Sequence, residues 1–437
     1  MPDIPIATAA SASAPPGRGL RVVLDARIWE GASGGVQQWV LGLATAFSAL
    51  EATGDEYLFL VNSGREAWLT PFVSGACRIL ATTAPAHRPS FLSKIRSAVA
   101  EQNPAARIVW HRLRMARDLP FSLPTSDGIV ERASADVVHF TFQEAFVTAI
   151  PSLYQPWDLQ HLHLPEFFSA RDRSRRELSY RAFCARAAMV ITATRWVKQD
   201  LIAQYGVPSE RIAVVNVPPV TSAYPDVTPE AVAALRLRHH LPDRFVYFPA
   251  QTWPHKNHAR LFQALGSLRA EGLRVPLVCS GQRNDRHPAV LRAAREAGIA
   301  DDVQFLGFVT PADVEALYRS ARALVFPSLY EGWGLPIVEA FRAGVPVACS
   351  SATSLPELVG DAALVFDPYD VEAIASAIRR LWTDDALANR LAELGRRRVA
   401  DFSWDRTART LRALYRLVAG RQLNEQDREL IAAEPLV

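Results

Sequence analysis

The chain has 437 residues, more than one domain usually holds, so two or three domains are expected. Hydrophobic residues make up 49% and charged residues 21%, which excludes a wholly disordered chain, and a formal net charge of +3 excludes the basic composition of a dedicated nucleic-acid binder. The cysteines lie far apart, which excludes a disulfide framework or an ordinary structural zinc site and favours a reducing compartment.

The start of the chain, residues 1–18, contains Ala, Ser and Pro but no basic segment followed by an apolar core. It is therefore predicted to be a disordered tail and not a secretion signal. No apolar run along the chain reaches the roughly 18 residues that a membrane-spanning helix needs. We expect a cytoplasmic protein.

The first half alternates short β-branched or aromatic runs with longer amphipathic stretches, the pattern of βαβ units in a parallel sheet. A strand is followed by a glycine-rich loop and a helix at the beginning, and similar units recur later. Residues 19–216 are therefore predicted to form a Rossmann-like domain. Its expected strands are 21–25, 57–61, 136–140, 189–192 and 212–216, and its expected helices are 36–50, 166–188 and 195–204.

A proline-rich segment opposes both helix and strand after residue 216, so residues 217–240 are predicted to be a linker. The alternation then restarts, which predicts a second Rossmann-like domain over residues 241–437 that ends in helices. The expected fold class is α/β, with two doubly wound domains facing a central cleft. The expected strands of the second domain are 244–249, 277–280, 303–306, 323–326, 345–349 and 363–366.

Ligands of open α/β sheets bind at the carboxyl ends of the strands, and the most informative segment, residues 326–344, follows such a strand. Its glycines make Glu331 a loop residue, whereas Pro336 suits the first turn of a helix that carries Glu339. The two carboxylates flank backbone N–H groups near residues 334–337, which would attract a phosphate. The alternative is an ordinary helix start whose glutamate favours the helix dipole.

Glu331–Glu339 with these glycines resembles the Glu-x7-Glu signature of the retaining glycosyltransferases of family 4, which have the two-domain GT-B fold. The resemblance extends over residues 303–308, 323–344, 345–359 and 363–374, and more thinly over the first half. It implies that Glu331 holds sugar hydroxyls of a nucleoside-diphosphate sugar and that Glu339 holds the ribose. It also makes Gly334, Leu335 and Phe308 expected donor-binding residues.

Lys256 follows the strand that ends at Pro249, and it is one of only three lysines in the chain. A lysine there can meet a donor diphosphate as a compact charge. Many family members carry Gly-Arg five to six residues earlier, where this chain has Ala250 and Gln251. Gln251 is kept as a donor-binding candidate, and Arg283 is a candidate for the missing cation, with an ordinary surface arginine as the alternative.

Two further candidates lie in the first half. Gly34 and Gly35 resemble the family's N-terminal glycine loop, where the absence of a Cβ lets the backbone approach a phosphate or an acceptor. Residues 156–168 resemble a family segment that reads His-Asp-Leu, with Trp157 at the histidine position. Asp158 or His161 is expected to orient the sugar or to accept the acceptor's proton, and a packed loop histidine is the alternative.

Basic residues are concentrated in two stretches of the first half, residues 88–117 and 171–186. Such segments suit a membrane surface that carries a lipid-linked acceptor, and a solvated helix face is the other interpretation. Neither a metal nor another cofactor is expected, because there is no Asp-x-Asp and the ligand spacing is poor. No nucleic-acid partner is expected.

The resemblance thus implies a retaining hexosyltransferase, and the residues predict that it needs no metal. It would move a sugar from a nucleoside diphosphate to a glycan or lipid-linked acceptor in cell-surface polysaccharide synthesis, and it would work in the cytoplasm or peripherally on the inner face of the membrane. The segments HKNH and WGLP resemble those of family members that act on cell-surface polysaccharide, which implies GDP-mannose as the leading donor and leaves UDP and dTDP sugars open. The alternatives are an epimerase-like or phosphorylase-like enzyme of the same fold and a non-catalytic partner subunit.

Overall fold

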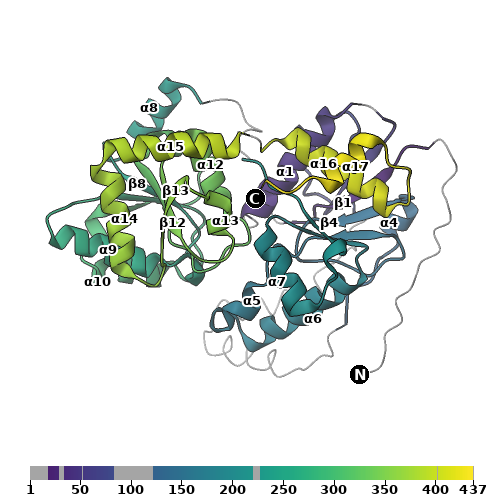
Figure 1. Cartoon of the computed structure of the whole chain (residues 1–437), viewed down its shortest axis with the longest axis horizontal. Helices are drawn as coiled ribbons and strands as arrows, with labels where there is room; N and C mark the ends of the chain where they lie inside the picture. Colours follow the sequence, from purple (N-terminus) through teal and green to yellow (C-terminus); the bar gives the residue numbers. More distant parts are fainter. Residues whose placement is uncertain are drawn as a thin grey trace, which may run out of the picture.

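The computed structural model describes residues 18–28, 34–51, 53–82, 122–219, 227–400 and 402–436. These residues form two domains, each a parallel sheet with helices packed on its faces (Figure 1). The predicted α/β fold with two Rossmann-like domains is confirmed. The alternating hydrophobic runs produce it, because the central strands are buried on both faces and most crossovers between parallel strands return through a helix.

Within the described residues, the first sheet has seven strands, and every pairing between them is parallel. The strand order reverses between β1 and β4, so the crevice outside their carboxyl ends is the place where such a fold binds ligands. In spatial order the strands are β3 (Cys77–Ala81), β2 (Glu56–Val61), β1 (Arg21–Asp25), β4 (Val137–Phe140), β5 (Ser152–Tyr154), β6 (Met189–Thr192) and β7 (Ile212–Val214).

The helices of this domain that matter for the site follow β1, β5 and β6. They are α1 (Gly34–Ala49), α5 (Gln160–His163), α6 (Ala170–Arg186) and α7 (Arg195–Tyr205), with the single turn α4 (Ile129–Arg132) before β4. Helices α6 and α7 both begin with a side-chain cap, in which Ser169 and Thr194 accept a hydrogen bond from the first turn. These caps fix where each helix starts relative to the sheet edge.

The second sheet has six parallel strands, and its order reverses between β8 and β11. In spatial order they are β10 (Val303–Phe305), β9 (Leu277–Ser280), β8 (Val246–Pro249), β11 (Ala323–Phe326), β12 (Val347–Ser350) and β13 (Ala363–Phe366). Seven helices cover it: α9 (His258–Ala270), α10 (His287–Glu296), α11 (Pro311–Ser320), α12 (Leu335–Ala343), α13 (Leu355–Val359), α14 (Val371–Thr383) and α15 (Asp385–Val399).

The segment predicted as a linker contains a helix. Residues 229–238 form α8 (Pro229–Arg238), because Thr228 caps the helix and Pro229 fits its first turn. Helix α8 is tied to α11, since Arg238 forms an ion pair with Asp313 at 2.5 Å. Because α8 packs with the second domain, the segment that only connects the two domains is shorter than the predicted linker, residues 217–240.

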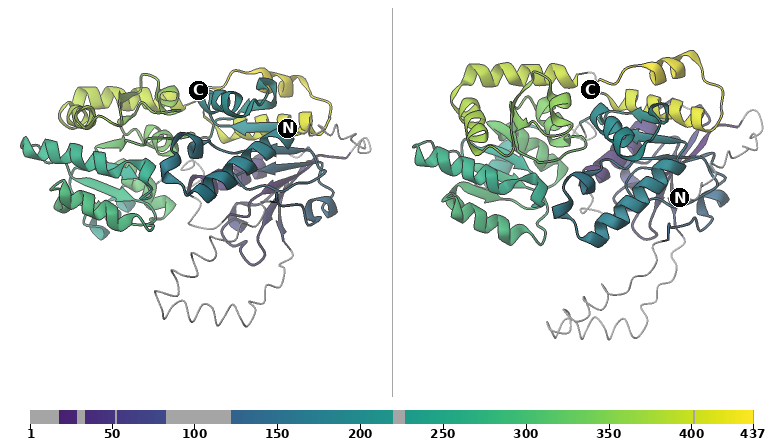
Figure 2. Two further views of the ribbon diagram at one scale, coloured as in Figure 1. Left: turned by 90° about the horizontal axis from the view of Figure 1, so that it is seen from below. Right: turned by 60° about the horizontal axis from the view of Figure 1, so that its bottom comes forward.

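The last two helices, α16 (Trp404–Val418) and α17 (Glu425–Ala432), return to the first sheet (Figures 1 and 2). The hydroxyl of Tyr415 lies 2.8 Å from Nδ1 of His139, and Arg416 pairs with Asp55 at 3.2 Å. The sequence assigns residues 241–437 to the second domain as a whole, whereas α16 and α17 pack against the first domain. Apolar faces of α1 and α16 that would otherwise be exposed cover one another.

Candidate active site

The ion pair between Lys256 and Glu331 is the centre of the candidate site. Nζ of Lys256 lies 2.5 Å from Oε1 of Glu331, and the side chains are only 17% and 13% exposed. Lys256 follows β8 and Glu331 follows β11, the two strands between which the sheet order reverses. The topology therefore brings together two residues that lie 75 positions apart in the sequence.

The position of Lys256 is fixed by its neighbours. A short turn over Pro254–Lys256 ends at Asn257, whose φ of 62° is left-handed. The Asn257 side chain donates hydrogen bonds to the carbonyls of Pro327 (3.0 Å) and Pro368 (2.8 Å). The Lys256 ammonium also lies 5.2 Å from the centre of the Phe326 ring, a cation–π distance.

The loop that carries Glu331 is held by the loop that follows β12. The Glu331 N–H donates to Oγ1 of Thr353 (3.0 Å), and the hydroxyls of Thr353 and Ser354 both donate to the Glu331 carbonyl at 2.8 Å. These bonds fix the backbone, so the carboxylate is left for Lys256 and for a ligand. A nearly buried ion pair contributes little to stability, which favours a role in binding.

The amides before α12 are fewer than the sequence suggests. Pro336 has no N–H, and the Ile337 N–H donates to the Gly334 carbonyl at 2.9 Å. Of the predicted row 334–337, Gly334 and Leu335 are left to offer N–H groups to an anion. Gly334 adopts a φ of 112°, a conformation that a residue with a side chain rarely takes.

Glu339 lies deeper than Glu331. It is 9% exposed, and the hydroxyl of Tyr318 donates to its Oε2 at 2.9 Å. Burial raises the pKa of Glu339 to about 7, and the carboxylate of Glu315 adds to this rise. Glu339 therefore holds a proton more readily than an ordinary glutamate.

The start of α1 faces the second domain. A Cβ placed on Gly34 would lie 3.7 Å from Nε2 of Gln251, and one placed on Gly35 would lie 3.9 Å from a methyl group of Leu335. The glycines let the first domain approach the loops that carry Lys256 and Glu331. The sequence predicts a glycine-rich loop over residues 31–35, and its residues 31–33 lie outside the described residues.

Asp158 reaches the site from the first domain. The preceding Trp157 has a φ of 68°, unusual for a bulky residue, and its indole N–H donates to the Thr141 carbonyl at 3.0 Å. A Cβ on Gly332 would lie 2.5 Å from the Trp157 carbonyl oxygen and 3.2 Å from the Asp158 Cβ. Burial raises the pKa of Asp158, and Glu331 adds to the rise while Lys256 opposes it.

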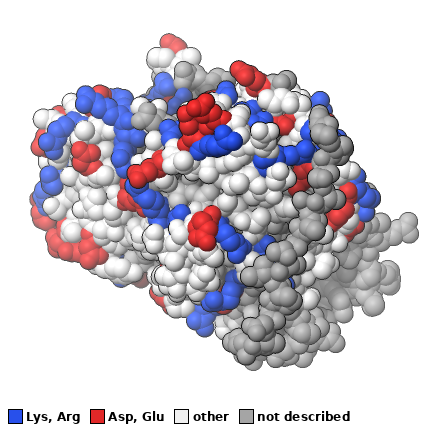
Figure 3. Space-filling view, turned by 45° about the vertical axis from the view of Figure 1, so that its right-hand side comes forward, with Lys and Arg blue, Asp and Glu red and all other residues white. Residues whose placement is uncertain are grey.

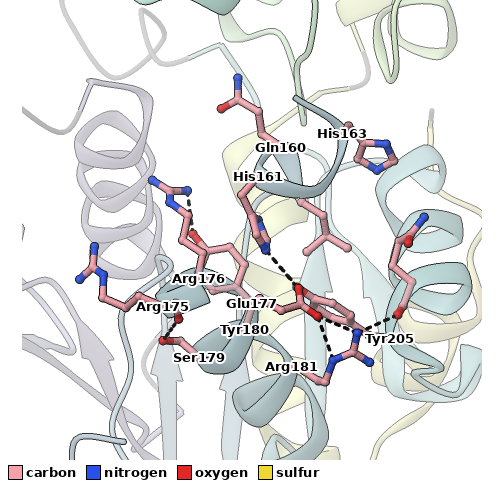
Figure 4. A network of polar contacts seen from close by, with 12 residues as sticks. Gln160, His161, His163, Arg175, Arg176, Glu177, Ser179, Tyr180, Arg181 and Tyr205 are labelled. Carbon is pink, nitrogen blue, oxygen red and sulfur yellow. Dashed lines mark hydrogen bonds and ion pairs between the residues drawn. The ribbon is translucent and has the colours of Figure 1, made fainter. Parts of the chain in front are cut away.

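His161 lies in a network inside the first domain (Figure 4). It is 1% exposed, and its Nε2 lies 3.3 Å from both the Glu177 carboxylate and the Tyr205 hydroxyl. Arg181 completes the network through Glu177 at 2.7 Å. Burial lowers the pKa of His161, although Glu177 opposes this effect. The structure thus brings Asp158, and not His161, to the Lys256–Glu331 pair.

Three contacts between the domains involve residues that the sequence did not single out. Oγ1 of Thr194 donates to the Gly332 carbonyl at 3.3 Å, and the Tyr330 hydroxyl accepts from the Leu159 N–H at 3.3 Å. The Glu357 carboxylate accepts from the first two amides of α7, both at 2.8 Å. Helix α7 is therefore capped partly from the other domain.

Arg283 and Phe308 lie further out. Arg283 donates to the Phe305 carbonyl at 3.1 Å, and Phe308 is 67% exposed. Arg283 follows β9 and Phe308 follows β10, and both strands lie on the side of β8 that is away from β11. The loops after β9 and β10 are therefore separated from the Glu331 loop by the loop after β8, which carries Gln251. Within the described residues, no group of three or more His, Cys, Asp or Glu side chains could hold a metal ion.

Solved glycosyltransferase structures share this architecture. The chain superposes on Anabaena HepE in complex with UDP-glucose with a TM-score of 0.66 at 16% identity, covering 91% of this chain and 99% of that one. WaaG, a glycosyltransferase of lipopolysaccharide biosynthesis, gives 0.61 at 17% identity over 91% and 100%. These likenesses define the fold as GT-B.

The family follows from the sequence comparisons. Residues 33–217 match "Glycosyltransferase Family 4", and residues 236–398 match "Glycosyl transferases group 1". The chain is 33% identical over 264 residues to the Escherichia coli O-antigen chain mannosyltransferase B, covering 60% of this chain and 69% of that protein. It is also 33% identical over 229 residues to the E. coli serotype-specific mannosyltransferase WbdA, covering 51% of this chain and 28% of that protein. The chain belongs to the family 4, group 1 glycosyltransferases.

Proposed function

We propose that the protein transfers a mannosyl group from GDP-mannose, with retention of configuration and without a metal, to a glycan or lipid-linked acceptor of a cell-surface polysaccharide. The observation that carries this proposal is the Lys256–Glu331 pair. A bound diphosphate can replace the Glu331 carboxylate as the ion-pair partner of the Lys256 ammonium, and sugar hydroxyls can then donate hydrogen bonds to Glu331. The two E. coli relatives named as mannosyltransferases support the choice of sugar.

The chemistry needs stabilisation of the leaving diphosphate more than it needs an enzyme nucleophile. The bond to the diphosphate breaks through a positively charged, oxocarbenium-like sugar, so preorganised donors at the diphosphate lower the barrier. Lys256 and the Gly334 and Leu335 amides would supply these donors. Glu331 would orient the sugar, Glu339 would hold the ribose, and Asp158 would face the acceptor hydroxyl.

Donor identity is tested by thermal shift with GDP, GDP-mannose, UDP and UDP-glucose, because a ligand at 100 times its Kd stabilises the folded state by about 2.7 kcal/mol. We expect the guanosine compounds to raise the Tm and the uridine compounds to have no effect. The opposite result would refute GDP-mannose. The configuration at the anomeric carbon of the product, determined by NMR, then tests retention.

The same reactions separate the alternatives. Release of free sugar or dependence on inorganic phosphate would indicate the epimerase-like or phosphorylase-like function. Binding of a donor without turnover in the presence of any acceptor would indicate a partner subunit. Chelation with EDTA tests metal independence, and we expect unchanged turnover.

We also propose that the protein works peripherally on the cytoplasmic face of a membrane. Arg171 and Arg175 on α6 are exposed and share a face with Leu178, which is 52% exposed. On the face drawn in Figure 3, however, basic and acidic side chains of the described residues lie intermixed. The other basic stretch, 88–117, lies outside the described residues, and no helix in the described part of the chain is long and apolar enough to cross a bilayer.

Co-sedimentation with vesicles tests this location. We expect binding to phosphatidylglycerol vesicles but not to phosphatidylcholine vesicles, and we expect salt to weaken it. The Arg171→Glu, Arg175→Glu double variant should bind less well. Equal binding of the double variant and the wild type would contradict a role for α6.

A further inference from the structure

The Gln251 side chain is held in one orientation by Trp253. The indole N–H of Trp253 donates to Oε1 of Gln251 at 2.8 Å. An indole nitrogen can only donate, so the oxygen of the Gln251 amide must face it. This bond settles which end of the amide is the NH2 group, and it turns that group away from Trp253.

The NH2 group of Gln251 faces the other domain. Its Nε2 lies 3.7 Å from the position that a Cβ on Gly34 would occupy, at the first residue of α1. An amide NH2 group only donates hydrogen bonds, so a ligand that lies between the loop after β8 and the start of α1 can accept from it.

The backbone of Gln251 is fixed as well. The loop after β9 packs behind it, since a Cβ on Gly281 would lie 3.0 Å from the Gln251 nitrogen. The Thr252 hydroxyl donates to Oδ1 of Asn284 at 2.6 Å and ties the same two loops together. The orientation of the amide is thus set by its surroundings before any ligand arrives.

We propose that Trp253 is a positioning residue for the donor diphosphate and that it acts by fixing the Gln251 amide. This inference rests on the proposed function, since it takes the diphosphate of the nucleotide sugar as the acceptor for the Gln251 NH2 group. Many family members, by the resemblance described above, carry an arginine at the position of Gln251. Here an oriented neutral amide supplies N–H donors, and Lys256 supplies the charge.

The test is Trp253→Phe, which keeps an aromatic ring and removes the indole N–H. We expect the donor KM and the Kd for GDP to rise about threefold to tenfold, the size of one hydrogen bond, while kcat stays within about twofold. The Kd for guanosine, which lacks phosphates, should not change. An unchanged Kd for GDP, or an equal rise for guanosine, would overturn the proposal.

Two further variants make the test specific. Trp382→Phe is the matched control, because its ring packs on Arg244 (4.6 Å), next to the amino end of β8 and away from the site. In a Gln251→Ala background, Trp253→Phe should have no further effect if it acts through Gln251. The same loss in both backgrounds would overturn the proposal.

The outcome also separates this inference from the proposed function. If the wild type transfers no sugar from any nucleotide donor, yet Trp253→Phe still weakens GDP binding, the proposed transfer fails and the assignment of Trp253 stands. If the wild type transfers mannose and Trp253→Phe matches it in donor KM, only the assignment of Trp253 fails.

Discussion

The two domains contribute differently to the site. On the proposed donor side, in the second domain, Lys256 and Glu331 are already paired, and the backbone of Glu331 is fixed by Thr353 and Ser354. On the proposed acceptor side, in the first domain, the side chains of both histidines in residues 158–163 are bound within their own domain. His161 binds Glu177, and His163 lies 2.8 Å from Asp200.

Asp158 differs from these two histidines. Its pKa responds to Glu331 and Lys256, both in the second domain. The donor side is therefore organised around two opposite charges, Lys256 and Glu331, that are available to a ligand. The acceptor side is a folded network through which one carboxyl group reaches the site. Substitutions on the two sides should therefore differ in what they change.

The largest effect is expected from Lys256→Met. It removes the charge that would stabilise the leaving diphosphate and leaves Glu331 without its partner, so kcat should fall by about 10²–10³. The measurement is turnover of the donor identified by thermal shift, with circular dichroism to confirm folding. A folded Lys256→Met protein that keeps more than about a tenth of the wild-type kcat would contradict the role of the Lys256 charge on the donor side.

The second effect is the contrast between Asp158→Asn and His161→Gln. Because Asp158 faces the ion pair and His161 does not, Asp158→Asn should lower kcat by about 10²-fold, whereas His161→Gln should lower it by less than tenfold. His161→Gln should instead lower the Tm, since it disturbs the Glu177–Tyr205 network. The reverse order of the two kcat values would return His161 to the catalytic role predicted from the sequence.

The sequence predicts the donor side better than the acceptor side for a physical reason. Lys256 and Glu331 each follow a recognisable buried strand, and parallel strands bring their carboxyl ends to one edge. Their meeting requires only the correct strand order. The glycines and proline around Glu331 are local signals that need no tertiary context.

The acceptor side depends on contacts that no local pattern contains. The strained backbone of Trp157, which directs Asp158, is supported by Thr141 and by Trp39, whose ring lies 5.8 Å away. The capping of α7 by Glu357 joins residues about 160 positions apart. A threonine before a helix predicts the cap at Thr194, but nothing in the sequence shows that the second domain completes it. The packing of α16 against the first domain cannot be predicted from the sequence for the same reason.

Glu339 gives a pH-dependent prediction for the donor side. Its pKa is raised from an ordinary 4.5 to about 7 by burial, so between these values the folded state holds a proton that the unfolded state has released. The free energy of unfolding should therefore fall as the pH rises through this range. In Glu339→Gln the fall between about pH 5 and pH 8 should be smaller by roughly 1–3 kcal/mol.

Urea unfolding of the ligand-free protein at both pH values measures this difference. Glu372→Gln, which changes an exposed glutamate in the first turn of α14, is the matched control and should follow the wild type. Parallel pH profiles for the wild type and Glu339→Gln would show that Glu339 titrates as an ordinary carboxyl group.

The smallest effect is expected where the two sides meet, at Glu357. Its carboxylate accepts from the N–H groups of Arg195 and Trp196, so it stabilises the arrangement in which Asp158 lies beside Glu331. Glu357→Gln keeps an acceptor but loses the charge that favours a helix N-terminus, a loss of about 0.3–1 kcal/mol. We expect kcat/KM for the acceptor to fall about twofold to fivefold, with the Kd for the nucleotide unchanged, because Lys256, Glu331 and Glu339 all lie in the second domain. A weaker Kd for the nucleotide would mean that the donor side is not organised independently of the first domain.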